Sequence, residues 1–316
     1  MKILVMGSGG VGGFFGAVLA RSGLEVWFVA RGNHLAAMKA GGLHIRSSAG
    51  NWIVPAGTMT DRPSDAGTAD IVLFCVKSYD TEETAQQLAP ILSPQSVVIS
   101  LQNGIENEEI LHRTVPKATI FGGAAYISAR ISAPGEILET GGLQRIAFGP
   151  MFGPIDKRAA EILAMFLQAG IKADLRQDMR AELWRKFTFI TSVGSLTALT
   201  RLNHRDMLAS PETMDLVFAA MKETETIART HGVLFEPLNP DKVIEGLRRF
   251  DGDTRSSMYY DLMNEKPLEI ESLNGTIVRM GKEANVPTPI HQTIYASLLP
   301  YHRRHVSTMN HERSRS

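Results

Sequence analysis

The chain has little of several features that mark whole classes of protein. Its 316 residues contain one cysteine, Cys75, so no intrachain disulfide can form. That cysteine lies in the apolar run IVLFCV, which favours a core residue over a nucleophile. No apolar run approaches the roughly 18 residues that span a bilayer, and no signal-peptide pattern opens the sequence. These absences argue against secreted and membrane-spanning proteins, and we expect a cytoplasmic protein.

An excess of charge of either sign is also missing. The 33 basic and 33 acidic residues cancel, which leaves no electrostatic footprint for nucleic acid or for an anionic membrane surface. The C-terminal histidines His302, His305 and His311 lack companion ligands, so no metal site is expected. The expected partner is therefore a small molecule. The oligomeric state is open, with a homodimer as one candidate assembly.

The first 31 residues carry the strongest pattern that is present. An apolar run at residues 3–6 predicts a parallel strand buried on both faces. G-x-G-x-x-G follows at residues 7–12, then apolar residues at helical spacing, then a second predicted strand at residues 25–30. In dinucleotide sites the first glycine permits the turn, the second admits the pyrophosphate, and the third lets the helix pack closely. The pattern therefore predicts a dinucleotide site, with the phosphates on the helix N-terminal amides.

The residue that closes the second strand indicates which dinucleotide binds. A free ribose 2'-hydroxyl usually meets an acidic residue there, whereas a 2'-phosphate needs a cation. Arg31 therefore favours NADPH over NADH, the alternative being a surface arginine at a strand end. Lys77 and Asn103 follow two later strands and should reach the same crevice, unless they are a solvated lysine and a turn asparagine. The residues expected to bind the cofactor are Gly7, Ser8, Gly9, Gly10, Val11, Gly12, Arg31, Lys77 and Asn103.

Length and strand signals predict two domains of different class. Residues 43–54 read as a hairpin, and short runs at residues 119–149 read as strands added to the same sheet. Strand signals end at 175, and helix starts then appear at Asp178, Ser210 and Asn239. We therefore expect an α/β fold in which an all-helical domain follows a Rossmann-type domain. The expected bounds are 1–177 for the Rossmann domain, 178–304 for the helical domain, and 305–316 for a disordered tail.

Polar residues embedded in apolar helices of the second half are the candidates for chemistry. Lys186 sits within AELWRKFTF, and a second segment, residues 256–278, contains Ser257, Asp261, Glu269 and Asn274. By periodicity alone, Lys186 and Glu269 can equally be ordinary residues of a polar helix face.

Taken together, these segments resemble the ketopantoate reductase (2-dehydropantoate 2-reductase) family. The resemblance covers residues 1 to about 300 and rests on the order and spacing of the glycine motif, Arg31, Lys77, Gln-Asn-Gly at 102–104, AELWRK at 181–186, SSM at 256–258 and LEIESLNG at 268–275. It implies a Rossmann domain, an all-helical domain and an active site in the cleft between them. It further implies NADPH-dependent reduction of 2-dehydropantoate to (R)-pantoate, a step of pantothenate and coenzyme A biosynthesis.

The resemblance also assigns roles to single residues. Lys186 corresponds to the catalytic lysine, Glu269 to the substrate-binding glutamate, Ser257 to a serine that contacts substrate, and Asn103 to the asparagine near nicotinamide and substrate. The chemistry agrees, because hydride addition to the C2 carbonyl builds negative charge on oxygen that an ammonium can stabilise and then protonate.

The chain departs from the family pattern at three positions. Asparagines expected four and eight residues after the lysine are replaced by Ile190 and Gly194, and Thr254 stands where another asparagine is common. These losses favour a related reductase of another 2-oxo acid as the nearest alternative. A noncatalytic NADP(H)-binding sensor is a third hypothesis, but a sensor has no need of both Lys186 and Glu269.

Overall fold

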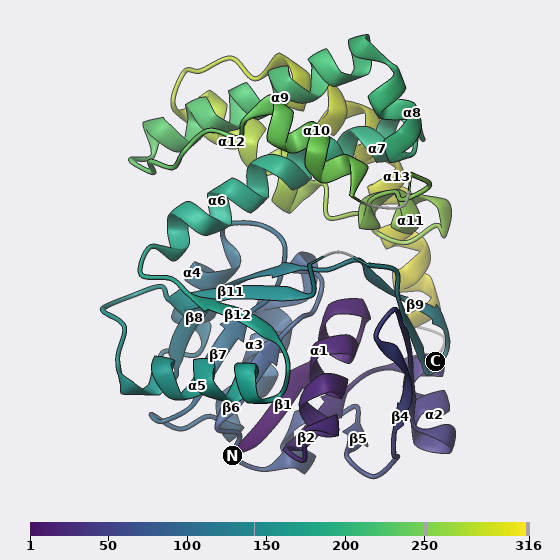
Figure 1. The fold of residues 1–316 in the computed structure, drawn as a ribbon, viewed down its shortest axis with the longest axis vertical. Coiled ribbons are helices and arrows are strands. Elements are labelled where there is room, and N and C mark those ends of the chain that lie inside the picture. The colour runs from purple at the N-terminus through teal and green to yellow at the C-terminus, as the bar shows by residue number, and fades with distance from the viewer. Residues whose placement is uncertain (142, 250–251, 314–316) are drawn as a thin grey trace. The chain divides into compact units, whose positions relative to one another are not determined.

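The computed structural model describes residues 1–141, 143–249 and 252–313. They form two compact units, Met1–Leu183 and Trp184–Ser316. The first is an α/β unit and the described part of the second is helical, which confirms the predicted fold class (Figure 1). The division falls inside helix α6 (Met179–Phe189), not in the loop at residue 177 where the sequence had suggested it.

An eight-stranded sheet organises the first unit, in the order β12-β11-β8-β7-β6-β1-β2-β5. All neighbouring strands are parallel except β11, which runs antiparallel to β8. Their bounds are β1 Lys2–Met6, β2 Glu25–Val29, β5 Met59–Thr60, β6 Ile71–Phe74, β7 Val97–Ser100, β8 Thr119–Tyr126, β11 Arg145–Pro150 and β12 Lys172–Leu175. The chain moves outward from β1 in one direction through β2 and in the other through β6. Ligands of such sheets bind at the carboxyl ends of the strands at this switch point.

Helices cover both faces of this sheet. They are α1 Gly10–Arg21, α2 Gly32–Gly41, α3 Thr81–Leu88, α4 Asn107–Thr114 and α5 Lys157–Gln168. Alternate residues of β1 enter different cores, because Ile3 and Val5 belong to one apolar cluster while Leu4 and Met6 belong to another. The continuous apolar run of β1 is therefore explained by burial on both faces, as predicted.

A second, four-stranded sheet has the order β4-β3-β10-β9. The predicted hairpin is confirmed as β3 (Leu43–Ser47) and β4 (Gly50–Val54), which pair antiparallel. The prediction that residues 119–149 extend one sheet is wrong for β9 (Ala129–Ala133) and β10 (Glu136–Glu139), because β10 pairs parallel with β3. This sheet covers α1, and a Cβ on Gly13 would lie only 2.9 Å from the Ile137 side chain.

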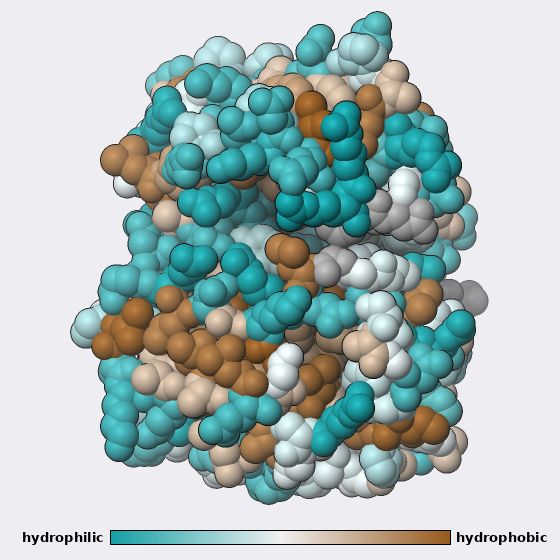
Figure 2. All heavy atoms as spheres, in the orientation of Figure 1, coloured by the Kyte–Doolittle hydropathy of each residue, from teal (hydrophilic) through white to brown (hydrophobic). Residues whose placement is uncertain are grey.

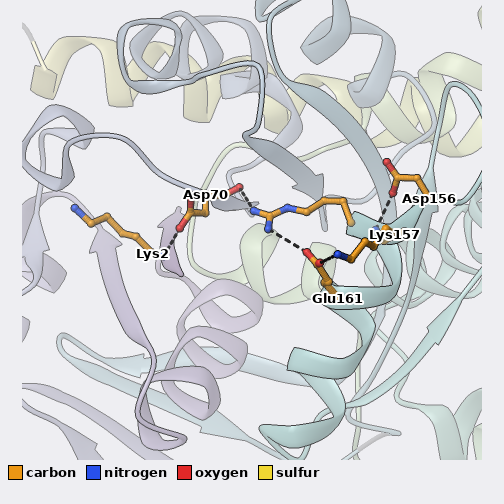
Figure 3. Close-up of polar contacts among 7 residues, drawn as sticks. Lys2, Asp70, Asp156, Lys157 and Glu161 are labelled. Atoms are coloured by element: carbon orange, nitrogen blue, oxygen red, sulfur yellow. Dashed lines mark hydrogen bonds and ion pairs between the residues drawn. The ribbon is translucent and has the colours of Figure 1, made fainter.

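Polar contacts secure the amino-terminal edge of the main sheet (Figure 3). The backbone N–H of Lys2 donates to the Asp70 carboxylate at 2.7 Å, and Nη2 of Arg158 lies 3.5 Å from the Asp70 carbonyl oxygen. Asp156 caps the first turn of α5, as its side chain accepts a backbone N–H at 2.9 Å. These contacts occupy the edge opposite to the carboxyl ends of β1 and β6.

The second unit consists of helices joined by short connections. They are the remainder of α6, α7 Ser195–Thr200, α8 His204–Ala209, α9 Pro211–Thr230, α10 Pro240–Arg248, α11 Ser257–Met263, α12 Thr276–Glu283 and α13 Pro289–Arg313, with π-helical segments η4 Ile190–Gly194 and η5 Glu271–Gly275. The predicted starts are confirmed, because Asp178, Ser210 and Asn239 each accept a backbone N–H of the following turn. None of the described helices has the length and apolar character needed to cross a membrane.

Helix α13 overturns the expectation of a disordered tail for residues 305–313, which are helical. His305 is buried, and its Nδ1 lies 2.8 Å from the Lys266 carbonyl oxygen. Residues 304–313 also contain neither glycine nor proline to end the helix. Residues 314–316, which belong to the same prediction, lie outside the described residues.

Hydrophobic side chains gather on one part of the first unit, over α5, β11 and β12 (Figure 2). The exposed apolar residues of this region include Ile155 and Leu167. Apolar side chains of this kind are common on folded proteins, because polar groups cannot cover a whole surface. By themselves they assign no function to this face.

Candidate functional site

The glycine-rich turn has a geometry that fits a pyrophosphate. Gly7 has φ +99°, and a Cβ there would lie 2.9 Å from the Val76 backbone nitrogen. A Cβ on Gly12 would lie 2.2 Å from the Gly7 carbonyl oxygen, so only glycine lets α1 pack this closely. Around Gly9 the space is open, because apart from its chain neighbours no described atom lies within 4 Å of a Cβ position. The crowded glycines shape the turn, and the uncrowded one faces space that a ligand can fill.

Ser8 shapes the turn instead of offering a donor to the ligand. Its backbone N–H and its hydroxyl both donate to the Val29 carbonyl oxygen, at 3.0 and 2.9 Å. Helix α1 begins at Gly10, so the N–H groups of Gly10, Val11 and Gly12 have no acceptor within the helix. These amides at the start of α1 can serve as phosphate donors.

Arg31, Lys77 and Asn103 follow neighbouring strands at the same edge. Met6 of β1 pairs with Val29 of β2, so Arg31 leaves the sheet beside the glycine turn, and its side chain is exposed. Lys77 follows β6 and Asn103 follows β7, and both are half-buried. The carboxyl edge of β2, β1, β6 and β7 thus gathers every residue expected to bind the cofactor.

A buried hydrogen-bond network, which the sequence did not reveal, supports two of these residues. Gln102 Nε2 donates to the carbonyl preceding Lys77 at 3.0 Å and to Thr81 Oγ1 at 2.8 Å. Asn107 lies 3.1 Å from Thr81 Oγ1 and donates from Nδ2 to the Asn103 carbonyl at 2.9 Å. The network fixes the backbone beside both Lys77 and Asn103. In the sequence, the only hint of this network is Gln102 within the Gln-Asn-Gly segment.

In the second unit, Lys186 lies on a helix with an irregular continuation. Its side chain is half-buried, and its neighbours Trp184 and Phe187 are buried. Helix α6 continues directly into the π-helical segment η4. Asn274 Nδ2 donates to the Thr191 carbonyl oxygen at 3.0 Å, a side-chain bond to the irregular turn. π-Helical turns of this kind occur frequently at functional sites.

Asn274 is itself held by a fully buried histidine and a serine. Its Oδ1 accepts from Ser195 Oγ at 2.6 Å, and its Nδ2 lies 2.9 Å from Nδ1 of His291. Since the amide group donates, Nδ1 of His291 accepts, and the ring proton is on Nε2, which lies 2.9 Å from Thr224 Oγ1. The network requires a neutral His291, and burial lowers the pKa of this imidazole to about 4.

This histidine makes stability depend on pH. Between pH 4 and about 6.5 the His291 imidazole is protonated in the unfolded chain but neutral in the folded protein. The free energy of unfolding should therefore fall as the pH falls through this range. Each unit of lowered pKa is worth about 1.4 kcal/mol. Urea unfolding of His291→Gln should show a shallower decline than the unaltered protein. The exposed His112→Gln is the matched control, and identical slopes for all three proteins would refute the expectation.

Glu269 is a buried carboxylate in the segment that precedes η5. Its side chain is 6% exposed, and glutamates are rarely this buried without a partner or a function. The Glu269 carbonyl accepts the backbone N–H of Leu273 at 3.0 Å. Because Asn274 bonds to Thr191, the segment that carries Glu269 is fastened to the continuation of the Lys186 helix.

Ser257 occupies the first position of α11 and is exposed. The preceding Ser256 caps this helix and donates from Oγ to the Gly194 carbonyl oxygen at 2.7 Å. The N-terminus of α11 is therefore held against η4. The segments that carry Lys186, Glu269 and Ser257 thus meet at η4, with Ser256 and Asn274 making the bonds.

The positions that lack the family's asparagines present apolar surface and space. Ile190 is half-buried, and a Cβ on Gly194 would lie 3.9 Å from the Cβ of Ile190 and 3.7 Å from that of Ser256. These are ordinary contact distances, so a side chain at Gly194 can be accommodated. The carbonyl of Thr254 accepts the His204 backbone N–H at 3.1 Å.

Comparison with known proteins gives consistent matches along the chain. Residues 3–153 match the family model described as Ketopantoate reductase PanE/ApbA, and residues 178–302 match the model of its C-terminal part. A 2-dehydropantoate 2-reductase of Archaeoglobus fulgidus is 30% identical over 294 residues, which cover 93% of this chain and 95% of that protein.

Solved structures of similar fold support the same family. The crystal structure of a PanE/ApbA family ketopantoate reductase from Ralstonia eutropha JMP134 has a TM-score of 0.86 at 30% identity, covering 96% of this chain and 99% of that one. A ternary structure of D-mandelate dehydrogenase with NADH and anilino(oxo)acetate has a TM-score of 0.87 over 97% and 99% of the chains, and at 23% identity it shows a shared fold. The chain therefore belongs to the ketopantoate reductase family of nicotinamide-dependent oxidoreductases.

Proposed function

We propose that the protein reduces a 2-oxo acid to a 2-hydroxy acid with NADPH, and that the substrate is 2-dehydropantoate, which yields (R)-pantoate for pantothenate biosynthesis. The Archaeoglobus fulgidus relative is a 2-dehydropantoate 2-reductase, which supports this substrate. The observation that carries the proposal is that a half-buried lysine, Lys186, and a buried glutamate, Glu269, lie on segments that Asn274 fastens together.

Each residue has a distinct role in the proposed reaction. The amides of Gly10, Val11 and Gly12 hold the pyrophosphate, and Arg31 pairs with the 2'-phosphate. Lys77 and Asn103 contribute at the same sheet edge. When bound, the reduced nicotinamide supplies the hydride that is added to C2 of the substrate.

The second unit supplies the proton. The ammonium of Lys186 stabilises the negative charge that develops on the carbonyl oxygen and donates its proton there, and solvent then reprotonates the amine. Glu269 accepts a hydrogen bond from a substrate hydroxyl and orients the carbonyl, which is a positioning effect. Ser257 is a further substrate contact. One 2-oxo acid, one NADPH and one proton give one 2-hydroxy acid and NADP⁺.

The direct test is NADPH oxidation measured against a panel of 2-oxo acids. We expect turnover, with the highest kcat/KM for 2-dehydropantoate. Turnover of none of the acids would refute the proposed reaction. A higher kcat/KM for another member of the panel would refute the proposed substrate while keeping the reaction.

A second candidate is a reductase of a more apolar 2-oxo acid. Ile190 and the space beside Gly194 favour it, because together they offer hydrocarbon contact where asparagines would offer hydrogen bonds. Such a surface binds an alkyl or aryl group better than a hydroxyl.

Ile190→Asn separates the two candidates. If 2-dehydropantoate is the substrate, the new amide should lower its KM by about fivefold, the value of one hydrogen bond near 1 kcal/mol. If an apolar 2-oxo acid is the substrate, the variant should raise that KM, since an unpaired amide would face hydrocarbon. Steady-state kinetics with both substrates gives the answer, and Ile190→Val is the control that keeps the surface apolar. No change with either substrate would mean that Ile190 does not line the site.

A further inference from the structure

His34 joins three segments of the first unit that are far apart in the sequence. It lies in the first turn of α2 and is half-buried. Its Nε2 lies 3.0 Å from the Ser8 carbonyl oxygen, and its Nδ1 accepts the backbone N–H of Gly135 at 3.0 Å. Because a backbone N–H only donates, Nδ1 carries no proton, so the proton of the neutral ring is on Nε2 and is donated to Ser8. The two contacts select one tautomer.

The bond to Ser8 fixes the orientation of one peptide group in the glycine-rich turn. In a trans peptide the C=O and the next N–H point to opposite sides, and no cis peptide occurs among the described residues. With the Ser8 carbonyl directed toward His34, the N–H of Gly9 points away from that ring. The bonds from the Ser8 N–H and hydroxyl to Val29 hold Ser8 itself but do not involve its carbonyl, so the His34 bond acts directly on the Ser8–Gly9 peptide group.

Gly135 in turn holds the imidazole ring. It lies in the turn between β9 and β10 with φ +77°, and a Cβ there would lie 3.0 Å from the Cβ of Ala37 in α2. Its carbonyl accepts the backbone N–H of His44 at 2.9 Å, which fastens this turn to β3. His34 is therefore held on one side by the second sheet while it holds the glycine turn on the other.

We infer that His34 is a positioning residue of the cofactor site, which keeps the Ser8–Gly9 peptide turned so that the Gly9 N–H donates to the pyrophosphate. The inference rests on the proposed dinucleotide binding. Without the imidazole the Ser8 carbonyl loses its partner, and the peptide can rotate and withdraw the Gly9 donor. His34 itself needs no contact with the cofactor.

Two conservative variants separate the two bonds of the ring. Glutamine at position 34 can place its amide N–H near the position of Nε2 and donate to Ser8, whereas asparagine can place its oxygen near Nδ1 and accept from Gly135. We expect His34→Ala to weaken NADPH binding about tenfold, the effect of losing one hydrogen bond to a charged group. His34→Gln should recover most of this loss, and His34→Asn should recover little.

The probes are NADPH and 2'-AMP, titrated by calorimetry into the intact protein. 2'-AMP carries the 2'-phosphate and no pyrophosphate, so His34→Ala should leave its affinity unchanged while Arg31→Ala lowers it. An equal loss for both probes in His34→Ala would overturn the inference, since it would report general damage to the unit. Unchanged NADPH affinity in His34→Ala, or recovery by asparagine and not by glutamine, would also overturn it. Failure of the unaltered protein to bind NADPH would instead refute the proposed function.

Discussion

Lys186→Ala is expected to lower kcat by roughly 100-fold or more, because general acid catalysis is typically worth 10² to 10⁴ in rate. Affinity for NADPH should stay nearly unchanged, since the residues proposed to bind it belong to the first unit and Lys186 to the second. Steady-state turnover and a separate cofactor titration measure the two quantities. A loss in both would point to a folding defect and not to a missing proton donor.

Two further variants sharpen this result. Arg180→Ala removes an exposed cation from the same helix and should leave kcat unaltered. Lys186→Arg keeps the positive charge but supplies a group that does not release its proton at working pH, so its kcat should remain low. Near-normal turnover in Lys186→Ala would move the search for the proton donor to Ser257 or to a water bound by Asn103.

The features that could be predicted from the sequence are those set by local pattern. The continuous apolar run at residues 3–6 and the spacing of the glycines predict a strand, a turn and a helix, and the structure contains them as β1, the turn and α1. Helix starts at Ser210 and Asn239 were equally local, because a capping side chain reaches only the next turn.

The features that escaped prediction depend on contacts between distant residues. The parallel pairing of β10 with β3 joins residues about 90 positions apart, and a short strand does not encode which partner it takes. The π-helical turn after Lys186 is bonded by Asn274, and no local signal marks it. The role of His34 is hidden from the sequence for the same reason, since its partners are Ser8 and Gly135.

The domain boundary shows the same limit. Glu182, in α6, accepts from the hydroxyl of Tyr126 at 2.7 Å and pairs with Arg145 at 3.3 Å, which ties the start of this helix to the first unit. The second part of the helix, from Trp184, belongs to the second unit. A boundary inside a continuous helix leaves no composition change to detect, so the sequence placed it at the preceding loop.

Arg31→Ala is expected to remove most of a preference for NADPH over NADH. Arg31 is exposed and leaves β2 beside the glycine-rich turn, where a dinucleotide site holds the adenosine ribose. A charge-assisted contact with the 2'-phosphate is worth roughly 1.5 to 3 kcal/mol, so NADPH affinity should fall about 10- to 150-fold. NADH lacks this phosphate, and its affinity should hardly change.

The effect of Arg31→Ala is measured by titrating NADPH and NADH separately, with a second exposed arginine as the control. Arg21 is exposed at the far end of α1, and its guanidinium lies 5.0 Å from the centre of the Trp52 ring. Arg21→Ala should therefore keep the NADPH preference that Arg31→Ala loses. Added salt should weaken NADPH binding more than NADH binding in the unaltered protein, because an exposed ion pair is screened. Equal affinity of the unaltered protein for NADPH and NADH would show that Arg31 does not read the 2'-phosphate, and the proposed preference for NADPH would be refuted.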